Sequence, residues 1–172
     1  MLTAKPDIDN GFKIQKESFL NEDASSLKDR INDLNLIKKA LLKYQHELSS
    51  AMNEDFGNRN QMESLFGDIL PLINTINYQI KKLPFWMRPS RRKPGLLLSP
   101  AKVEIHYQPL GVIGIIVPWN FPVQLSIHPL ITALSSGNRA MIKLSEFTPK
   151  TNTILQKLID ECFDKEKVML VH

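Results

Sequence analysis

The sequence predicts an α/β protein in which a layer of long helices precedes a partial, doubly wound parallel sheet. Apolar residues recur every three or four positions over residues 25–90, which is typical of amphipathic helices. Strand, helix, strand, helix and strand patterns then follow one another over residues 111–172, as in one half of a nucleotide-binding fold. Alternating residues between these parts add a hairpin arm over 91–110, and residues 1–24 are expected to be a flexible leader.

The composition favours an ordinary globular protein. The chain has 172 residues, 42% of them hydrophobic and 23% charged, with a net charge of +4 and no long block of like charge. Nucleic acid is therefore not an expected partner. The basic cluster from Arg88 to Lys93 is interrupted by prolines and is interpreted as a solvated connector, with a phosphate or partner contact as the alternative.

Cellular location is inferred from what the sequence lacks. Cys162 is the single cysteine, so no internal disulfide is possible and a reducing compartment is expected. The amino terminus has no signal-peptide pattern, and the longest apolar run is too short to span a bilayer. These features predict a cytoplasmic protein without a membrane partner.

The first long helix is expected to begin after the leader. Ser26 and Asp29 form a capping pattern at its start, and Gly57 and Asn58 end it. Its apolar stripe comprises Leu27, Ile31, Leu34, Ile37, Leu41, Tyr44, Leu48 and Met52.

A second helix is expected to follow, and Pro71 in its middle should kink it. Its stripe comprises Met62, Phe66, Ile69, Ile73, Ile76, Ile80 and Leu83. Two helices with one stripe each predict an antiparallel pair laid against another layer.

The hairpin arm is predicted from apolar residues that alternate with polar ones. Val103, Ile105 and Tyr107 alternate with polar residues, which indicates a strand with one wet face, and the preceding GLLLSPA stretch is expected to be its hairpin partner. His106 falls on the polar face without a second His or Cys at metal spacing. We therefore interpret it as a solvated residue and predict no metal site.

The last region carries the sheet. Val112–Val117 is continuously apolar and predicts a parallel strand buried on both faces. Helices are expected from Pro122 and from the cap formed by Thr148 and Pro149. The second and third strands are predicted at AMIK, residues 140–143, and at VMLV, residues 168–171.

Polar side chains follow the first two of these strands. Because ligands bind at the carboxyl ends of parallel strands, Trp119 and Asn120 should meet Lys143 and Glu146 at one edge. The indole could wall a cofactor cleft, and the amide could donate to an oxyanion. The alternatives are a core tryptophan and a helix-capping asparagine. The glycine spacing of an ordinary dinucleotide fingerprint is absent.

Three stretches, PLGVIGIIVPWNFP, PLITALSSGNRAMIKLSEFTP and QIKKLPFW, together resemble the amino-terminal part of an aldehyde dehydrogenase, closest to the class 3 and coniferyl aldehyde dehydrogenase branch. The resemblance runs from about residue 25 to the end. It implies oxidation of an aldehyde, such as an aromatic, coniferyl aldehyde-like one, to the acid with NAD or NADP. It also implies a homo-oligomer whose hairpin arm takes part in association.

The same resemblance implies roles for individual residues. Asn120 would stabilise the oxyanion, and Leu144 stands where the family usually has proline. The residues implied to contact the cofactor are Val117, Pro118, Trp119, Lys143, Ser145 and Glu146.

Two expected elements of the family's chemistry are missing. The cysteine nucleophile and glutamate base of the family lie beyond the end of this chain, and Cys162 falls on the core face of a helix with nothing to lower its pKa. We therefore expect an amino-terminal fragment, with a truncated NAD(P)-binding half, that is inactive by itself. The alternative is a non-catalytic remnant or interaction module with the same fold.

Overall fold

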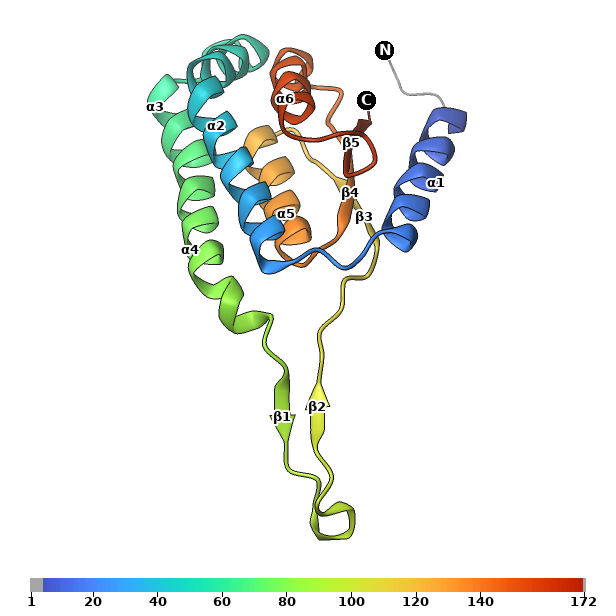
Figure 1. Ribbon diagram of the computed structural model, residues 1–172. Helices are drawn as coiled ribbons and strands as arrows, with labels where there is room; N and C mark the ends of the chain where they lie inside the picture. Colours follow the sequence, from blue (N-terminus) through green and yellow to red (C-terminus); the bar gives the residue numbers. More distant parts are fainter. Residues whose placement is uncertain (1–4, 172) are drawn as a thin grey trace.

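A three-stranded parallel sheet separates one amino-terminal helix from two layers of helices in the computed structural model, which describes residues 5–171 (Figure 1). The strand order is β3-β4-β5, with β4 in the centre. The strands are β3 (Val112–Ile116), β4 (Arg139–Lys143) and β5 (Val168–Val171). The helices α5 (Pro122–Ser135) and α6 (Pro149–Cys162) connect them, and α2 (Leu27–Phe56) and α4 (Leu70–Trp86) pack outside these. The predicted α/β fold is confirmed.

The core lies between the sheet and the helical layers. Ala140, Ile142, Val168 and Leu170 point to this side and are buried with the stripes of α5 and α6. The other face is only partly covered, so Ile116 is 85% exposed. The prediction that the first strand is buried on both faces is therefore wrong, because β3 is an edge strand and α1 shields only part of that face.

The first long helix is confirmed as α2. Ser26 and Asp29 form a reciprocal capping box at its start, and Gly57 ends it with φ 81°, a left-handed conformation that favours glycine. Leu34, Ile37 and Leu41 lie in the core.

The second predicted helix is divided in three: α3 (Gln61–Ser64), the π-helical segment η1 (Leu65–Ile69) and α4. Pro71 lacks an N–H and clashes with the preceding turn of a regular helix, and the wider π-turn relieves this. The extra residue in the π-turn also rotates the helical face that precedes η1 relative to the face of α4. Met62 and Phe66 are therefore exposed, against the prediction that they belong to the buried stripe.

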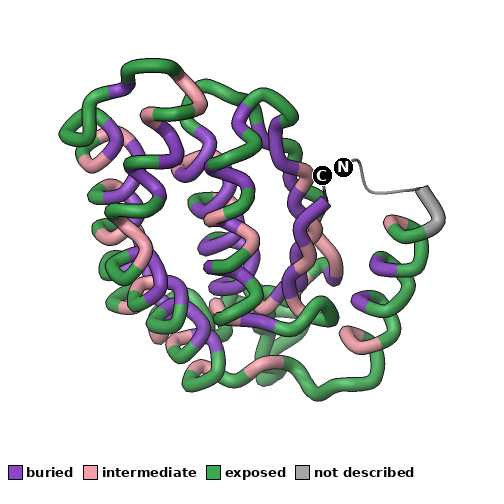
Figure 2. The backbone as a smooth tube through the Cα atoms, turned by 90° about the horizontal axis from the view of Figure 1, so that it is seen from above, coloured by how far each residue is buried: buried purple, intermediate pink, exposed green. Residues whose placement is uncertain are grey.

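Residues 5–21 form a helix, α1 (Lys5–Asn21), where the sequence predicted a flexible leader. Figure 2 shows α1 mostly exposed, with buried positions toward the sheet. Gln15 donates from Nε2 to the carbonyls of Ala140 (3.0 Å) and Lys165 (2.9 Å). Gly11 lies so close to the sheet that a Cβ there would be 2.3 Å from the sulfur of Met169. Of the rest of the predicted leader, residues 22–24 are described and lie outside the helix, and residues 1–4 lie outside the described residues.

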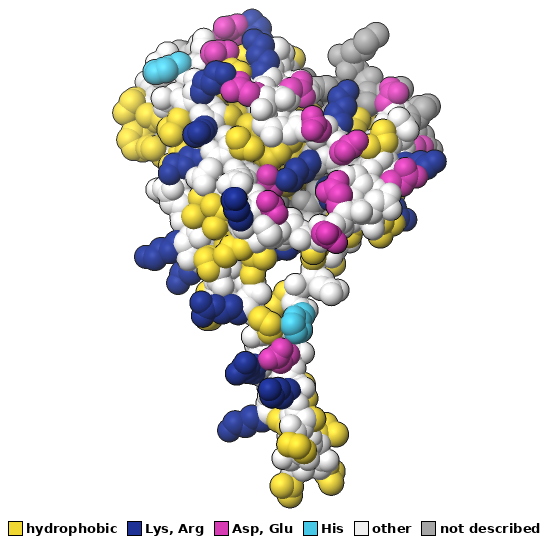
Figure 3. Space-filling model, in the orientation of Figure 1, with side chains coloured by type: hydrophobic (Ala, Val, Ile, Leu, Met, Phe, Trp, Pro, Cys, Tyr) yellow, Lys and Arg dark blue, Asp and Glu magenta, His cyan; other side chains and the backbone are white. Residues whose placement is uncertain are grey.

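The hairpin arm projects from the body (Figure 1), but its strand partners differ from the prediction. β1 (Ser90–Arg92) pairs with β2 (Val103–Ile105), so the basic stretch is the partner and the GLLLSPA stretch forms the tip. The tip contains the short 3-10 helix η2 (Leu96–Leu98), and Leu97 is 99% exposed. Figure 3 shows cationic side chains along the stem and apolar ones at the tip. No helix within residues 5–171 is long and apolar enough to cross a membrane.

Candidate functional site

The residues predicted to share one sheet edge do so. The Val117 amide donates to the Lys143 carbonyl at 3.0 Å, and the Leu144 amide donates to the Val171 carbonyl at 3.0 Å. The three strands therefore end level with one another. The segments 117–120 and 143–146 leave the sheet side by side at this edge, as the strand order predicted.

Trp119 and Asn120 both face outward at the exit of β3. The indole is 54% exposed and touches the body through a tilted contact with Phe56, with ring centroids 6.2 Å apart. It is not a core residue. Asn120 is exposed, and among residues 5–171 its side-chain amide makes no hydrogen bond. The residue at the N-cap position of α5 is Phe121, so the capping alternative for Asn120 is wrong.

A buried carboxylate from the π-helical segment caps α5 instead. Asp68 is 0% exposed, and its Oδ1 accepts from the Gln124 amide at 2.9 Å. Its Oδ2 accepts from Nη2 of Arg59 at 2.8 Å, and Nη1 of Arg59 donates to the Asn120 carbonyl at 3.1 Å. Burial raises the pKa of Asp68, while the hydrogen bond from Gln124 and the Arg59 charge oppose this shift.

Arg59 and Asp68 were not predicted from the sequence. Arg59 lies 61 residues from Asn120 in the sequence, and Asp68 lies 56 residues from Gln124. No local sequence pattern predicts contacts between residues so far apart. The nearest sequence signal is a charged residue falling inside an apolar helix stripe.

The amino end of α6 is capped in the same way. Asp55, in the last turn of α2, accepts from the backbone amides of Lys150 (3.1 Å) and Thr151 (2.8 Å). Thr148 occupies the N-cap position and Pro149 the first helical position, as predicted, but the Thr148 side chain makes no capping hydrogen bond. Both helices that follow the strand exits are thus fixed by carboxylates from the helical layer.

The second exit presents an ion pair. Lys143 Nζ lies 2.6 Å from Oε2 of Glu146, and this hydrogen bond lowers the pKa of Glu146. Both side chains reach the surface. Ser145 does not: it is buried, and its carbonyl accepts from Nδ2 of Asn152 at 2.7 Å. Leu144 is also buried, so it anchors the loop through packing where proline would act through rigidity.

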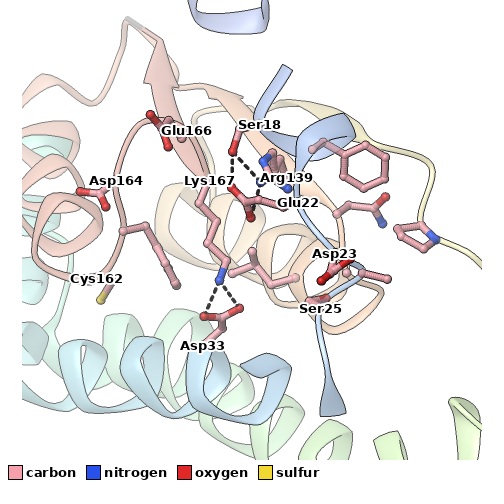
Figure 4. Close-up of a pocket in the computed structure, with 17 residues that line it drawn as sticks. Ser18, Glu22, Asp23, Ser25, Asp33, Arg139, Cys162, Asp164, Glu166 and Lys167 are labelled. Carbon is pink, nitrogen blue, oxygen red and sulfur yellow. Dashed lines mark hydrogen bonds and ion pairs between the residues drawn. The ribbon is translucent and has the colours of Figure 1, made fainter. Parts of the chain in front are cut away.

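Cys162 lies at the other end of the sheet, where the strands begin, beside a cavity of about 430 Å³ (Figure 4). Burial raises the pKa of its thiol to about 11. The cations in this cavity are paired: Arg139 lies 2.8 Å from Glu22, and Lys167 lies 2.6 Å from Asp33. The cavity therefore marks where α1 docks. No group of three or more potential metal ligands occurs among the described residues.

Comparison with known proteins gives consistent matches. The profile of the Aldehyde dehydrogenase family matches residues 2–172. The chain is 41% identical over 160 residues to a probable coniferyl aldehyde dehydrogenase of Pseudomonas aeruginosa, covering 93% of this chain and 34% of the relative. It is 34% identical over 156 residues to a coniferyl aldehyde dehydrogenase of a Pseudomonas species, covering 91% and 32%.

A solved structure, the substrate-bound state of Staphylococcus aureus AldH, superposes with a TM-score of 0.91 at 30% identity. The match covers 95% of this chain and 36% of that one. A succinic semialdehyde dehydrogenase of Streptococcus pyogenes in complex with NADP⁺ superposes at 0.83 and 15% identity, over 99% and 37% of the two chains, which shows a shared fold. The chain spans about a third of the length of the relatives it matches.

Proposed function

The chain belongs to the aldehyde dehydrogenase family, and we propose that it supplies the oxyanion-stabilising and ribose-binding parts of an enzyme that oxidises an aldehyde to a carboxylic acid with NAD⁺ or NADP⁺. The observation that carries the proposal is the sheet edge itself. The Asn120 amide, which makes no hydrogen bond to residues 5–171, and the Lys143–Glu146 pair leave adjacent strands there. This is where doubly wound folds bind ligands.

The residues at this edge fit a nicotinamide dinucleotide, which when bound supplies the acceptor for hydride. Lys143 can donate to ribose hydroxyls, and Glu146, with one oxygen engaged by Lys143, keeps a second oxygen that can accept from them. Trp119 presents an exposed aromatic wall, and Val117 and Pro118 form the base of the exit. Ser145 supports this loop from inside.

Asn120 has the chemistry needed to stabilise an oxyanion. Its amide N–H groups are free to donate to the oxygen of the aldehyde as that oxygen gains charge, and the surrounding backbone is fixed before substrate arrives. We propose an aromatic aldehyde of the coniferyl type as substrate, because two coniferyl aldehyde dehydrogenases are among the similar relatives. The choice between NAD⁺ and NADP⁺ stays open.

The chain alone is proposed to be inactive. The family chemistry needs a thiolate beside the oxyanion group, and Cys162 lies at the other end of the sheet with a raised pKa. A chimera tests the function: this chain replaces the matching third of the P. aeruginosa relative, and NADH formation from coniferyl aldehyde is followed. Asn120→Ala should lower kcat by about a hundredfold or more. An unchanged kcat would remove the proposed role.

Cofactor binding has a separate test on the 172-residue chain. Titration calorimetry with NAD⁺ should show weaker binding for Glu146→Gln than for the unaltered chain. Glu161→Gln is the matched control, because Glu161 pairs with Lys43 at the same distance of 2.6 Å on another surface. Equal affinities for both variants would contradict the assignment of Glu146.

Assembly and location complete the proposal. We propose a cytoplasmic homo-oligomer in which the hairpin arm contacts a second copy. Its support is the exposed leucine tip and a cleft of about 900 Å³ at the base of the arm, lined in part by Trp86, Met87, Tyr107 and Leu110. Apolar surface of this kind is unusual on a monomer. A strictly monomeric species by light scattering at high concentration would contradict it.

A further inference from the structure

We infer that Arg59 and Asp68 form a clamp that positions Asn120 by holding its carbonyl and the start of the helix that follows it. This inference rests on the proposed role of Asn120. The clamp comes from the turn before α3 and from η1, not from the sheet that carries Asn120.

Asp68 fixes the residues after Asn120. Pro122 has no N–H, so the free donors of the first turn of α5 are those of Val123 and Gln124, and both hydrogen-bond to Asp68. The carboxylate sits there in the favourable field of the helix amino end. The start of α5 is thereby tied to η1.

Arg59 fixes Asn120 itself. One arm of the guanidinium holds the Asn120 carbonyl while the other holds Asp68, and the side chain is only 5% exposed. Its carbon Cζ lies 5.1 Å from the ring centroids of both Phe56 and Phe121. A planar, two-armed cation is needed for this geometry, and lysine could not make both hydrogen bonds and both ring contacts.

The clamp leaves the Asn120 amide free. The Asn120 carbonyl and the first turn of α5 are held, whereas the Asn120 side chain is exposed and makes no hydrogen bond within residues 5–171. An oxyanion donor acts best when its position is set before the reaction begins. Arg59 and Asp68 are therefore positioning residues that never touch the substrate.

Amide exchange on the 172-residue chain tests the contact. Asp68→Ala should speed exchange at Val123 and Gln124 about tenfold or more relative to Lys150 and Thr151, which Asp55 caps independently. The control Asp33→Asn removes a similar ion pair, that with Lys167, at the other end of the sheet. It should leave exchange at Val123 and Gln124 unchanged. Unchanged exchange in Asp68→Ala would overturn the clamp.

A double-mutant cycle in the chimera tests whether the clamp acts through Asn120. Arg59→Lys should lower kcat about tenfold to a hundredfold while KM for NAD⁺ stays constant, and should have no further effect in Asn120→Ala. An equal loss in both backgrounds would overturn the inference, since a general loss of structure is independent of Asn120. If Asn120→Ala keeps full kcat, the proposed function fails by itself, and the exchange data decide whether the clamp exists.

Discussion

Replacing Gly137 by alanine should destabilise the protein by about 3 kcal/mol, against about 1 kcal/mol for the same change at Gly57. Both glycines follow a helix in nearly the same left-handed conformation, with φ 83° and φ 81°. The strain of placing a Cβ at positive φ is therefore common to both. The surroundings differ, since a Cβ at Gly57 would meet nothing within 4 Å.

The extra loss at Gly137 comes from Arg30. An added Cβ would lie 2.6 Å from Nη2 and 2.8 Å from Cζ of the Arg30 guanidinium, so this side chain must move. It is buried, and it donates to the carbonyls of Ser135 (3.2 Å) and Ser25 (3.1 Å). A lost hydrogen bond from a charged donor costs about 2 kcal/mol, which sets the expected difference between the two variants.

Urea denaturation followed by circular dichroism measures both losses, with an unchanged slope as evidence that the unfolded states are alike. In an Arg30→Ala background, Gly137→Ala should cost only the strain, about 1 kcal/mol. Equal losses for Gly137→Ala and Gly57→Ala in the unaltered background would refute the assignment to Arg30.

Two further predictions concern ionisable groups. Iodoacetamide should alkylate Cys162 about a hundredfold more slowly than an ordinary thiol at pH 8, because burial raises the pKa of Cys162 to about 11. Unfolding the chain in urea should abolish this difference. A normal rate in the folded chain would show that the thiol is accessible. Hydrogen bonds from Ser18 and Arg139 lower the pKa of Glu22 below 4.5 in the folded chain. The contribution of these bonds to docking α1 is therefore complete above pH 4.5, and it is lost as the pH falls through the lowered pKa of Glu22. Exchange of α1 amides, corrected for intrinsic rates, should therefore accelerate in acid, and Glu22→Gln should show no such dependence; a pH-independent rate in the unaltered chain would contradict the docking role.

The sequence predicted those elements whose signals are local. The apolar stripe and capping box of α2 identify it without knowledge of its partners, and the run after Gly111 identifies β3. The alignment of the strand exits also followed, because consecutive parallel strands joined by helices place their carboxyl ends together. Trp119, Asn120, Lys143 and Glu146 were accordingly placed at the correct edge.

What the sequence did not predict depends on distant contacts. α1 has no clear stripe because it docks through Gly11 and Gln15 onto a sheet more than 120 residues away. The hairpin partner of β2 was misplaced because exposed strands carry no burial pattern, and all three residues of β2 are exposed. Arg59 and Asp68 could be recognised only once the fold had brought η1 to the start of α5.

The carboxylates at the first turns of α5 and α6 also determine which anions this edge tolerates. In many nucleotide-binding folds a phosphate lies at a helix amino end, where free N–H groups point at it. Here Asp68 and Asp55 take those N–H groups, so a pyrophosphate brought to either helix would find these donors already hydrogen-bonded. A glycine-rich phosphate loop engineered between β3 and α5 would bind no phosphate unless Asp68 were also removed, and its removal would release Arg59. Presenting a fixed amide and receiving a phosphate are thus mutually exclusive uses of this helix end.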